Sequence, residues 1–237
     1  MAGAFAGRLA LVTGASRGIG AATAEALAKA GAHVILTART AAGLEEVEER
    51  IHEAGGAATI APLDLTDGDS IGKLAAAAAE RWGTLDILVL NAAMLGTLTP
   101  VPAIEGKEFN KLLTLNLVAQ AAMIAAFDPL LRNSEAGRLI AVTSSVGRQP
   151  RAFWGAYGAS KAALETLVLS YGEEMRNLGG GLKVAIVDPG ATATVMRARA
   201  FPGEDQATLK PPGAVADAIV ALLQSDFETG RRLEIAG

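Results

Sequence analysis

Short apolar runs alternate with segments of helical periodicity along the whole chain, and this alternation constrains the fold more than any other feature. Seven runs are expected to be strands: Leu9–Thr13, His33–Ala38, Ala58–Leu63, Ile87–Asn91, Leu139–Thr143, Val184–Asp188 and Arg232–Ile235. Six segments are expected to be helices: Ile19–Ala30, Leu44–Ala54, Asp69–Trp82, Ile104–Leu131, Tyr157–Leu178 and Gly213–Gln224. Continuously apolar strands are typical of a parallel sheet that is covered on both faces. The sequence therefore predicts an α/β fold, a doubly wound parallel sheet of about seven strands joined by right-handed crossovers.

The composition fits one large domain, and it argues against several classes of chemistry. The chain has 237 residues, of which 51% are hydrophobic and 19% charged, so a large core can be buried. No linker or charge block divides it, and residues 1–237 are expected to form a single domain. The chain has no cysteine and only two histidines, His33 and His52, which argues against thiolate catalysis, a histidine triad or a metal site.

The net charge and the N-terminal residues bear on partners and location. A net charge of −4 gives no electrostatic footprint for nucleic acid or for an anionic membrane. Residues 1–7 contain no charged region followed by a long apolar stretch, so no secretory signal is predicted. The most apolar long stretch, Leu112–Leu131, is interrupted by polar residues and is expected to be buried rather than to span a membrane. A soluble cytoplasmic protein is expected.

A glycine-rich turn follows the first predicted strand and opens the first predicted helix. It reads Thr13-Gly14-Ala15-Ser16-Arg17-Gly18-Ile19-Gly20, with the spacing G-x-x-x-G-x-G. Gly14 suits a tight turn, Gly18 allows a pyrophosphate to approach the backbone, and Gly20 permits close packing of helix on strand. The helix N-terminus offers N–H groups to the anion. An ordinary βα turn is the alternative, but the position between strand and helix favours dinucleotide binding.

The end of the second predicted strand indicates which dinucleotide is bound. The usual fingerprint has an acidic residue there that binds the ribose 2′-hydroxyl, whereas this chain has Thr37-Ala38-Arg39-Thr40. Arg39 could pair with a 2′-phosphate, and Arg17 in the glycine turn could reach the same group. A solvated arginine at a strand end is the alternative. Two arginines and the missing carboxylate favour NADP(H) over NAD(H).

Tyr157 and Lys161 lie four residues apart at the start of a predicted helix, so their side chains share one face. The ordinary tyrosine pKa of about 10 is too high for easy proton exchange at neutral pH. A nearby ammonium favours the phenolate and is expected to lower the pKa of Tyr157 toward the range of a general acid or base. Such a pair alone occurs often by chance. Here it follows a glycine-rich turn, an asparagine and a serine, and together these residues predict an enzyme.

Several short motifs occur in the order and spacing of a known family. They are Thr13–Gly20, Asp64-Leu65, Asn91-Ala92-Ala93, Asn116, Ser144, Tyr157-x-x-x-Lys161 and Pro189-Gly190. On these residues the chain resembles the short-chain dehydrogenase/reductases over essentially its full length. Within the family it resembles a little-characterised bacterial oxidoreductase subgroup, on the runs Thr143–Gln149 and Met196–Pro202. The resemblance implies a Rossmann-type fold. It also implies an NADP(H)-dependent enzyme that transfers hydride between the nicotinamide and a carbonyl or secondary alcohol substrate.

The resemblance also implies a role for each matching residue. Tyr157 would protonate the developing alkoxide, and Ser144 would donate a second hydrogen bond to it. Lys161 would hold the nicotinamide ribose, with Asn116 completing a water relay. The other cofactor-binding positions are Gly14, Ser16, Arg17, Gly18, Ile19, Gly20, Arg39, Asp64, Asn91, Pro189, Gly190, Thr192 and Thr194. One departure is Ala93, where the family usually has a glycine, and its methyl group could tighten the cofactor site.

Three of these assignments keep an alternative. Ser144 lies thirteen residues before Tyr157, as in the family, but adjacent Ser145 is the fallback because successive strand residues face opposite sides. Asp64 is matched to an adenine contact and could equally be a turn or N-cap carboxylate. Asn116 is unfavourable in the middle of a helix, which suggests a specific role, although a buried amide satisfied by backbone is the alternative.

Substrate, assembly and a second function class complete the expectations. The candidate pocket walls are Met94, Leu95, Phe153 and Trp154, with Arg148, Arg151, Arg197 and Arg199 as candidate charges. The stretch Thr192–Pro212, with mixed polarity and three prolines, is the expected substrate lid.

Excess apolar residues in Ile104–Leu131 and in the helix from Tyr157 predict, together with the family, a homodimer or homotetramer. A catalytically silent NADP-binding sensor or scaffold is the alternative function.

Overall fold

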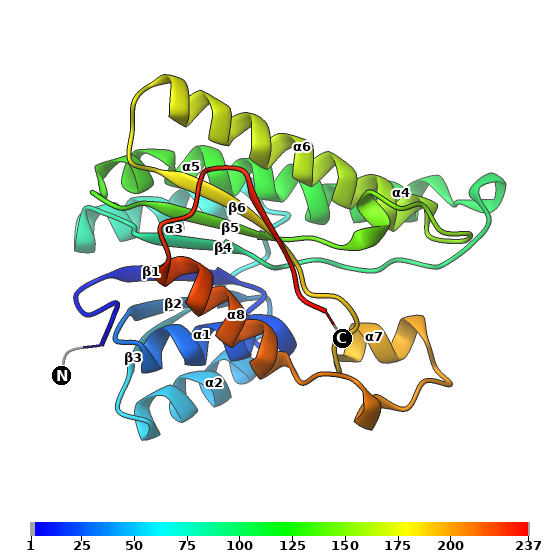
Figure 1. Cartoon of the computed structure of the whole chain (residues 1–237), viewed down its shortest axis with the longest axis horizontal. Coiled ribbons are helices and arrows are strands. Elements are labelled where there is room, and N and C mark those ends of the chain that lie inside the picture. The colour runs from blue at the N-terminus through cyan, green and yellow to red at the C-terminus, as the bar shows by residue number, and fades with distance from the viewer. Residues whose placement is uncertain (1–2, 237) are drawn as a thin grey trace.

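The chain forms a seven-stranded parallel sheet with helices on both faces (Figure 1). The computed structural model describes residues 3–236. In the order β3-β2-β1-β4-β5-β6-β7, the strands are Ala57–Pro62, His33–Ala38, Leu9–Thr13, Ile87–Leu90, Arg138–Val142, Lys183–Asp188 and Arg231–Glu234. Every strand boundary falls within one residue of its predicted position, because a continuous apolar run marks a strand that is buried on both faces. The predicted doubly wound α/β fold is confirmed.

Two layers of helices cover the sheet (Figure 1). The helices are α1 (Gly18–Lys29), α2 (Ala41–Glu53), α3 (Gly68–Trp82), α4 (Gly106–Leu113), α5 (Ala119–Asn133), α6 (Gly155–Asn177), α7 (Val195–Ala200) and α8 (Pro212–Gln224). One layer contains α1, α2 and α8, and the other contains α3, α5 and α6. A separate apolar core lies under each layer, with Leu44 and Ile219 buried in the first and Phe127 and Val168 in the second.

The helix predicted over Ile104–Leu131 is present as a 28-residue helical stretch, Gly106–Asn133, but it is not a regular α-helix throughout. α4 begins only at Gly106, and a π-helical turn, Thr114–Val118, separates it from α5. The π turn contains Asn116, whose side chain bonds to groups outside its own helix. Widened turns of this kind are frequent at functional sites. The break therefore coincides with a residue that the sequence had already singled out.

The 28-residue stretch Gly106–Asn133 is long and apolar enough to cross a membrane by length and composition alone. In this fold Met123, Phe127 and Leu131 of α5 are completely buried against the sheet. One face of the stretch therefore packs in the core of the protein.

The expected lid Thr192–Pro212 carries a helix, α7, that was not predicted. The hydroxyl oxygen of Thr194 caps it by accepting a hydrogen bond from the N–H of Arg197 at 3.1 Å. With six residues, α7 is too short for helical periodicity to stand out in the sequence. A bridge between Thr192 and Lys210 joins the two ends of the segment, so it leaves the sheet edge and returns to nearly the same place.

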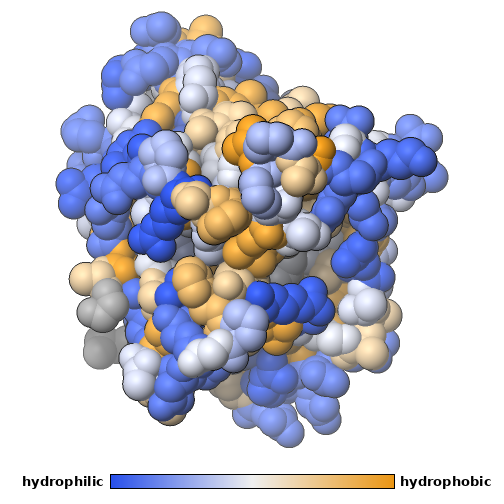
Figure 2. Space-filling model, turned by 90° about the vertical axis from the view of Figure 1, so that its right-hand side faces the viewer, coloured by the Kyte–Doolittle hydropathy of each residue, from blue (hydrophilic) through white to orange (hydrophobic). Residues whose placement is uncertain are grey.

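The strand order reverses at β1, which has β2 on one side and β4 on the other. In a doubly wound sheet, ligands bind in the crevice outside the carboxyl ends of the strands at such a switch point. The predicted site motifs follow β1, β4, β5 and β6, so the topology brings them to this edge. Figure 2 looks onto the edge and shows apolar side chains gathered in its middle with hydrophilic ones around them.

Candidate active site

The glycine turn has the backbone that a pyrophosphate cradle requires. Gly14 and Gly18 have φ angles of 65° and 59°, a left-handed conformation that glycine adopts without strain. Gly20 lies so close to β1 that a Cβ on it would overlap the carbonyl oxygen of Gly14. Ser16 lies beside the start of α2, and Ile19 packs against the adjacent core. Among residues 3–236 no side chain caps the N-terminus of α1, which leaves its N–H groups available to an anion.

Thr13 and Asn91 hold this turn in place. The hydroxyl oxygen of Thr13 accepts hydrogen bonds from the N–H groups of Asn91 and Ala92, at 2.9 and 3.0 Å. The side-chain amide of Asn91 donates to the carbonyl oxygens of Thr13 and Gly14, at 2.9 and 3.3 Å. Asn91 therefore links the end of β4 to the glycine turn. Thr13 was quoted only as part of the turn motif, and its role as a second link was not predicted.

Arg17 and Arg39 are the positive groups at this end of the crevice. Both are exposed, and neither forms an ion pair within the part of the chain that the structure describes. Asp64, in the loop after β3, accepts hydrogen bonds from the N–H and hydroxyl of Thr66 at 2.9 and 2.8 Å. These bonds, and to a smaller degree the charge of Arg39, hold the pKa of Asp64 below its ordinary value. Asp64 is thus a turn carboxylate, and Asp67 is the N-cap of α3.

Tyr157 and Lys161 lie in the first turns of α6, and both are almost completely buried. The Nζ of Lys161 lies 5.7 Å from the centroid of the Tyr157 ring and donates a hydrogen bond to the carbonyl oxygen of Val142 at 2.9 Å. Burial lowers the pKa of Lys161 to about 8, although the charge of Glu165 opposes this change. The shared helix face that the four-residue spacing predicts is present.

The expected lowering of the Tyr157 pKa is wrong for this conformation. Burial, followed by the charge of Asp188, raises the pKa of Tyr157 above its ordinary value. Lys161 lies over the ring and forms no hydrogen bond with the hydroxyl group, which instead contacts the Sδ of Met196 at 3.9 Å. A phenolate here would need water or a closer positive charge. The neutral phenol is nevertheless the proton-donating form that a carbonyl reduction uses.

The segment that contains Ser144 packs closely on the start of α6. A short 3₁₀ turn, Ser145–Gly147, follows Ser144. A Cβ on Gly158 would come within 2.7 Å of a carbonyl oxygen of this turn, and one on Gly147 within 3.0 Å of the α6 backbone. The two glycines therefore allow the turn to lie against the helix that carries Tyr157. The choice between the two adjacent serines stays a prediction.

Asn116 is completely buried, and protein groups satisfy its side chain. Its Oδ1 accepts from the N–H of Met94 at 2.8 Å, and its Nδ2 donates to the carbonyl oxygen of Met94 at 2.9 Å and to the Oγ of Ser160 at 3.1 Å. Ser160 in turn donates to the carbonyl oxygen of Tyr157 at 2.7 Å. A buried amide satisfied mainly by backbone, which was the alternative assignment, is therefore present. Ser160 was not predicted, although it directly precedes Lys161.

The turn after β6 begins at Pro189 and reaches the glycine turn. Gly190 has a φ of 60°, and its N–H donates to the carboxylate of the last β6 residue at 3.0 Å. Thr192 is buried, and its hydroxyl donates within the same turn at 3.0 Å. The Cγ2 of Thr194 lies 3.6 Å from the position that a Cβ on Gly18 would take. The two segments predicted to bind the cofactor therefore meet at one edge of the sheet.

Side chains of the expected lid lie over Tyr157. Met196 contacts its hydroxyl group, while the ring of Trp154 packs edge-on to Tyr157 at 5.9 Å and against Phe201 at 5.7 Å. Met196 and Phe201 were missed as pocket walls, because only the folded chain brings them to Trp154. Phe153, predicted as a wall, is 57% exposed. Hollows of about 510 and 280 Å³ lie along α8 instead, and neither is lined by Tyr157.

Two of the four candidate pocket arginines are paired with carboxylates. The guanidinium of Arg197 binds both oxygens of Glu204 at 2.5 Å. Arg148 binds Glu234 and lies 4.0 Å from the carboxylate of Glu165. These pairs neutralise charge that a substrate anion would otherwise meet. Glu165 was not predicted, although its position four residues after the buried lysine is a signal in the sequence.

Comparison with known proteins identifies the family. A family model described as short chain dehydrogenase matches residues 8–205. The oxidoreductase YciK of Escherichia coli K12 is 37% identical over 222 residues, which cover 92% of this chain and 87% of that protein. The chain therefore belongs to the short-chain dehydrogenase family. Its similarity to YciK confirms the expected relation to a little-characterised bacterial oxidoreductase subgroup.

Two solved structures have the same fold throughout. A short chain dehydrogenase of Shigella flexneri 2a, complexed with NADP, has a TM-score of 0.93 and 35% identity and covers 99% of both chains. A short chain dehydrogenase of Escherichia coli CFT073, complexed with NADPH, has a TM-score of 0.93 and 36% identity over 99% of this chain and 98% of that one. The Rossmann-type fold is confirmed.

Proposed function

We propose that this oxidoreductase depends on NADP(H) and transfers hydride between the nicotinamide and a carbonyl or secondary alcohol substrate. The observation that carries the proposal is the buried pair Tyr157 and Lys161, with Nζ 5.7 Å from the phenol ring at the edge where the glycine turn lies. Burial disfavours the charged form of an ammonium, so stability alone gives no reason to bury one beside a phenol. Perturbed titratable groups of this kind are typical of active sites.

The residues at the sheet edge fit the cofactor. NADP(H) would supply or accept the hydride, and the protein would position it. The glycine turn and the N–H groups of α1 would hold the pyrophosphate, since the positive φ angles of Gly14 and Gly18 shape the turn and, within the described part of the chain, no side chain caps the start of the helix. Arg17 and Arg39 would pair with the 2′-phosphate. The two structural relatives that contain NADP and NADPH support this preference.

The proton would move at Tyr157. In reduction its hydroxyl would donate to the substrate oxygen, and Ser144 would donate a second hydrogen bond to that oxygen. Because Met196 now contacts the hydroxyl, the lid has to withdraw this side chain before a substrate can bind. The ammonium of Lys161 would bind the nicotinamide ribose, and Asn116 would support the site by holding Ser160 and, through it, the start of α6.

The substrate is proposed to be an uncharged, largely apolar carbonyl compound or the matching alcohol. Met196 contacts the Tyr157 hydroxyl, Trp154 packs edge-on to the Tyr157 ring, and Phe201 packs against Trp154. Arg197, one of the two candidate charges on the lid, already binds Glu204 through two hydrogen bonds of 2.5 Å. A carboxylated substrate would have to compete with that pair, whereas an apolar group would add to the aromatic contacts.

A panel of carbonyl compounds incubated with NADPH tests both parts of the proposal. It should contain aromatic and alicyclic ketones, their carboxylated analogues and an acyl thioester, with cofactor oxidation as the readout. Turnover of the neutral ketones is expected. Faster turnover of the carboxylated analogues would overturn the substrate class. Tight NADPH binding without turnover of any compound would favour the silent sensor or scaffold.

We also propose a homodimer or homotetramer that assembles through α5 and α6. Val118, next to α5, is 58% exposed, and Leu117 and Leu167 are only half-buried. Apolar surface on neighbouring helices is typical of an interface. Light scattering on a size-exclusion column tests this assembly, and a monomer at micromolar concentration would overturn it without affecting the enzymatic proposal. The cytoplasmic location stays a prediction.

A further inference from the structure

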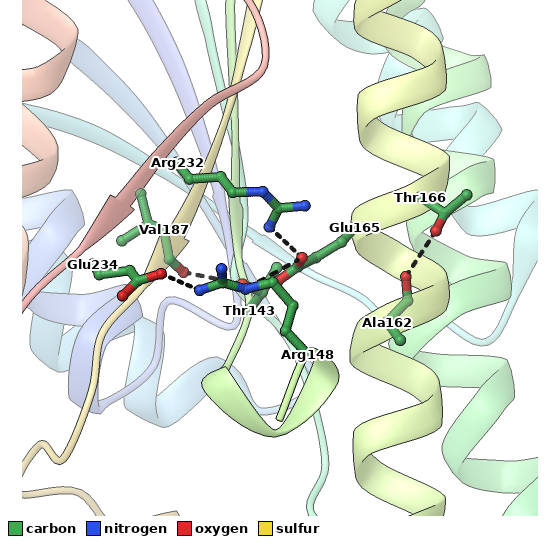
Figure 3. A network of polar contacts seen from close by, with 8 residues as sticks. All are labelled: Thr143, Arg148, Ala162, Glu165, Thr166, Val187, Arg232 and Glu234. Atoms are coloured by element: carbon green, nitrogen blue, oxygen red, sulfur yellow. Dashed lines mark hydrogen bonds and ion pairs between the residues drawn. The ribbon is translucent and has the colours of Figure 1, made fainter. Parts of the chain in front are cut away.

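Four charged side chains form a chain of ion pairs between α6, the turn after β5, and β7 (Figure 3). Glu165 of α6 is buried, with 4% of its surface exposed. Its carboxylate binds Arg232 of β7 and lies 4.0 Å from the Nε of Arg148. Arg148 also binds Glu234, the last residue of β7. The charges alternate in sign, so each of them lies beside an opposite one.

Stability does not explain the presence of Glu165. A buried ion pair contributes little net stability, because both charges have to leave water. The Oε1 of Glu165 is buried and has no hydrogen-bond partner among residues 3–236, which makes the position still less favourable. An apolar side chain would avoid both penalties. A carboxylate at this position therefore indicates that neighbouring groups use its charge.

Those neighbours belong to the candidate active site. Tyr157, Lys161 and Glu165 follow one another at four-residue intervals and share one face of α6. The charge of Glu165 raises the pKa of Lys161 and so opposes the effect of burial. Arg148 ends the 3₁₀ turn that begins after Ser144, so its contact with Glu165 fastens that turn to the helix.

The other charged groups around Lys161 do not replace Glu165. Asp188, at the end of β6, raises the pKa of Tyr157 instead. The side chain of Glu234 on β7 is 62% exposed, and water screens its charge. Arg148 and Arg232 are positive and act against an ammonium. Glu165 is the carboxylate on the same helix face as Lys161.

We propose that Glu165 is a positioning residue for the reaction: its buried charge supports the ammonium of Lys161, and through Arg148 it holds the Ser144 turn against α6. The inference rests on the proposed function, because Glu165 acts through residues assigned there. The two effects act on different steps. Loss of the charge would change cofactor binding, and loss of the link to Arg148 would change the alignment of the serine.

NADPH binding tests the effect on Lys161 without a substrate. Binding that needs the ammonium weakens as the pH rises through the Lys161 pKa, which is about 8 in the wild type. Glu165→Gln removes the charge that raises this pKa, so the weakening should begin about one pH unit lower. Fluorescence titrations between about pH 6 and pH 10 cover this range. Lys161→Met should lack the pH-dependent step, which identifies the group that titrates.

The matched control is Glu174→Gln, the same substitution at an exposed position of α6. Its pH profile should superimpose on that of the wild type. An unshifted Glu165→Gln profile beside a wild-type protein that binds NADPH would overturn this inference alone. Failure of the wild type to bind NADPH would overturn the proposed function and this inference with it.

Turnover tests the link to the Ser144 turn, and it does not require a Glu165 variant to fold. Arg148→Met should lower kcat about tenfold through misalignment of the serine, while NADPH affinity stays within about twofold of the wild type. Arg148→Lys should recover part of the loss. Arg176→Met, which breaks an exposed pair with Glu173 on the same helix, is the control and should leave kcat unchanged. An unchanged kcat in Arg148→Met would overturn this part of the proposal.

Discussion

The glycine turn and the lid adjoin each other at Gly18 and Thr194, but they are held by different kinds of interaction. Backbone geometry holds the glycine turn in its conformation, since Gly14 has a positive φ and Asn91 bonds to main-chain carbonyl oxygens. Side-chain contacts hold the lid over Tyr157, through Met196 and the ion pair of Arg197 with Glu204. A backbone requirement restricts a position to one residue type, whereas side-chain packing can be achieved in several ways. A substitution that adds a single methyl group to the turn should therefore weaken cofactor binding, whereas substitutions in the lid should have small effects.

The largest effect is expected at Tyr157, where the two regions meet. Tyr157→Phe keeps the ring against Trp154 but removes the proton, so kcat should fall by about 10²–10⁴-fold. NADPH affinity should hardly change, because the glycine turn is untouched. Steady-state kinetics on a neutral ketone and fluorescence titration measure the two quantities. Tyr171→Phe removes the hydroxyl of a second α6 tyrosine, bonded to Asp128 at 2.8 Å, and should leave kcat unchanged. Substantial turnover by Tyr157→Phe would refute the acid assignment.

The next prediction tests whether the glycine turn excludes side chains at the positions where its backbone packs closely. In Gly20→Ala the new Cβ would overlap the Gly14 carbonyl oxygen and come within 2.5 Å of the Asn91 amide nitrogen. The free energy of unfolding should fall by about 1–3 kcal/mol, and NADPH should bind more weakly. Gly72→Ala on α3 is the control, because a Cβ there meets open space and should stabilise the helix by about 1 kcal/mol. Urea unfolding and NADPH titration of both variants give the comparison.

This difference also explains how much could be predicted from the sequence. Burial of β1 on both faces leaves a continuous apolar run, and the close approach at Gly20 admits one residue type, so both are visible in the sequence. The π-helical turn around Asn116 is not visible, because it depends on bonds to Met94 and Ser160, which are distant in the chain. Helix α7 is hidden for a related reason, since its position depends on packing over Tyr157.

A third prediction concerns the charge beside the turn. Arg39→Asp removes the proposed partner of the 2′-phosphate and puts a second carboxylate near Asp64, so NADPH affinity should fall about 10–100-fold. NADH, which lacks the phosphate, should bind at least as well as it does to the wild type. Arg81→Asp, at an exposed position near the end of α3, is the control for the charge change. Equal affinity of the wild type for NADPH and NADH would contradict the NADP(H) preference.

The pKa of Tyr157 marks a limit of reasoning from spacing. The four-residue interval correctly predicts that Lys161 lies beside the tyrosine ring. It carries no information on the water around the hydroxyl, which Met196 covers from the lid. Burial then dominates and raises the pKa of Tyr157. The spacing in the sequence determines which side chains are neighbours on the helix. The tertiary fold determines how far those side chains are shielded from water, and so their pKa values.

The smallest effect is expected in the lid. Glu204→Gln keeps the shape of the side chain but removes one charge of the pair with Arg197, whose side chains are 26% and 23% exposed. Partly exposed pairs contribute little, so trypsin should cut after the exposed Arg199 only about two- to fivefold faster. Glu173→Gln breaks a pair on α6 and should leave cleavage in the lid unchanged.

The same lid variant tests whether the lid and the glycine turn are independent. If backbone geometry alone holds the glycine turn, Glu204→Gln should bind NADPH like the wild type while its lid is cut faster. The Cγ2 of Thr194 lies 3.6 Å from the Cβ position at Gly18, and this contact is where the lid and the turn adjoin. Parallel changes in cleavage and NADPH affinity would mean that the contact couples them into one cooperative unit. Faster cleavage with unchanged NADPH affinity would show that the lid can change its stability without affecting the glycine turn.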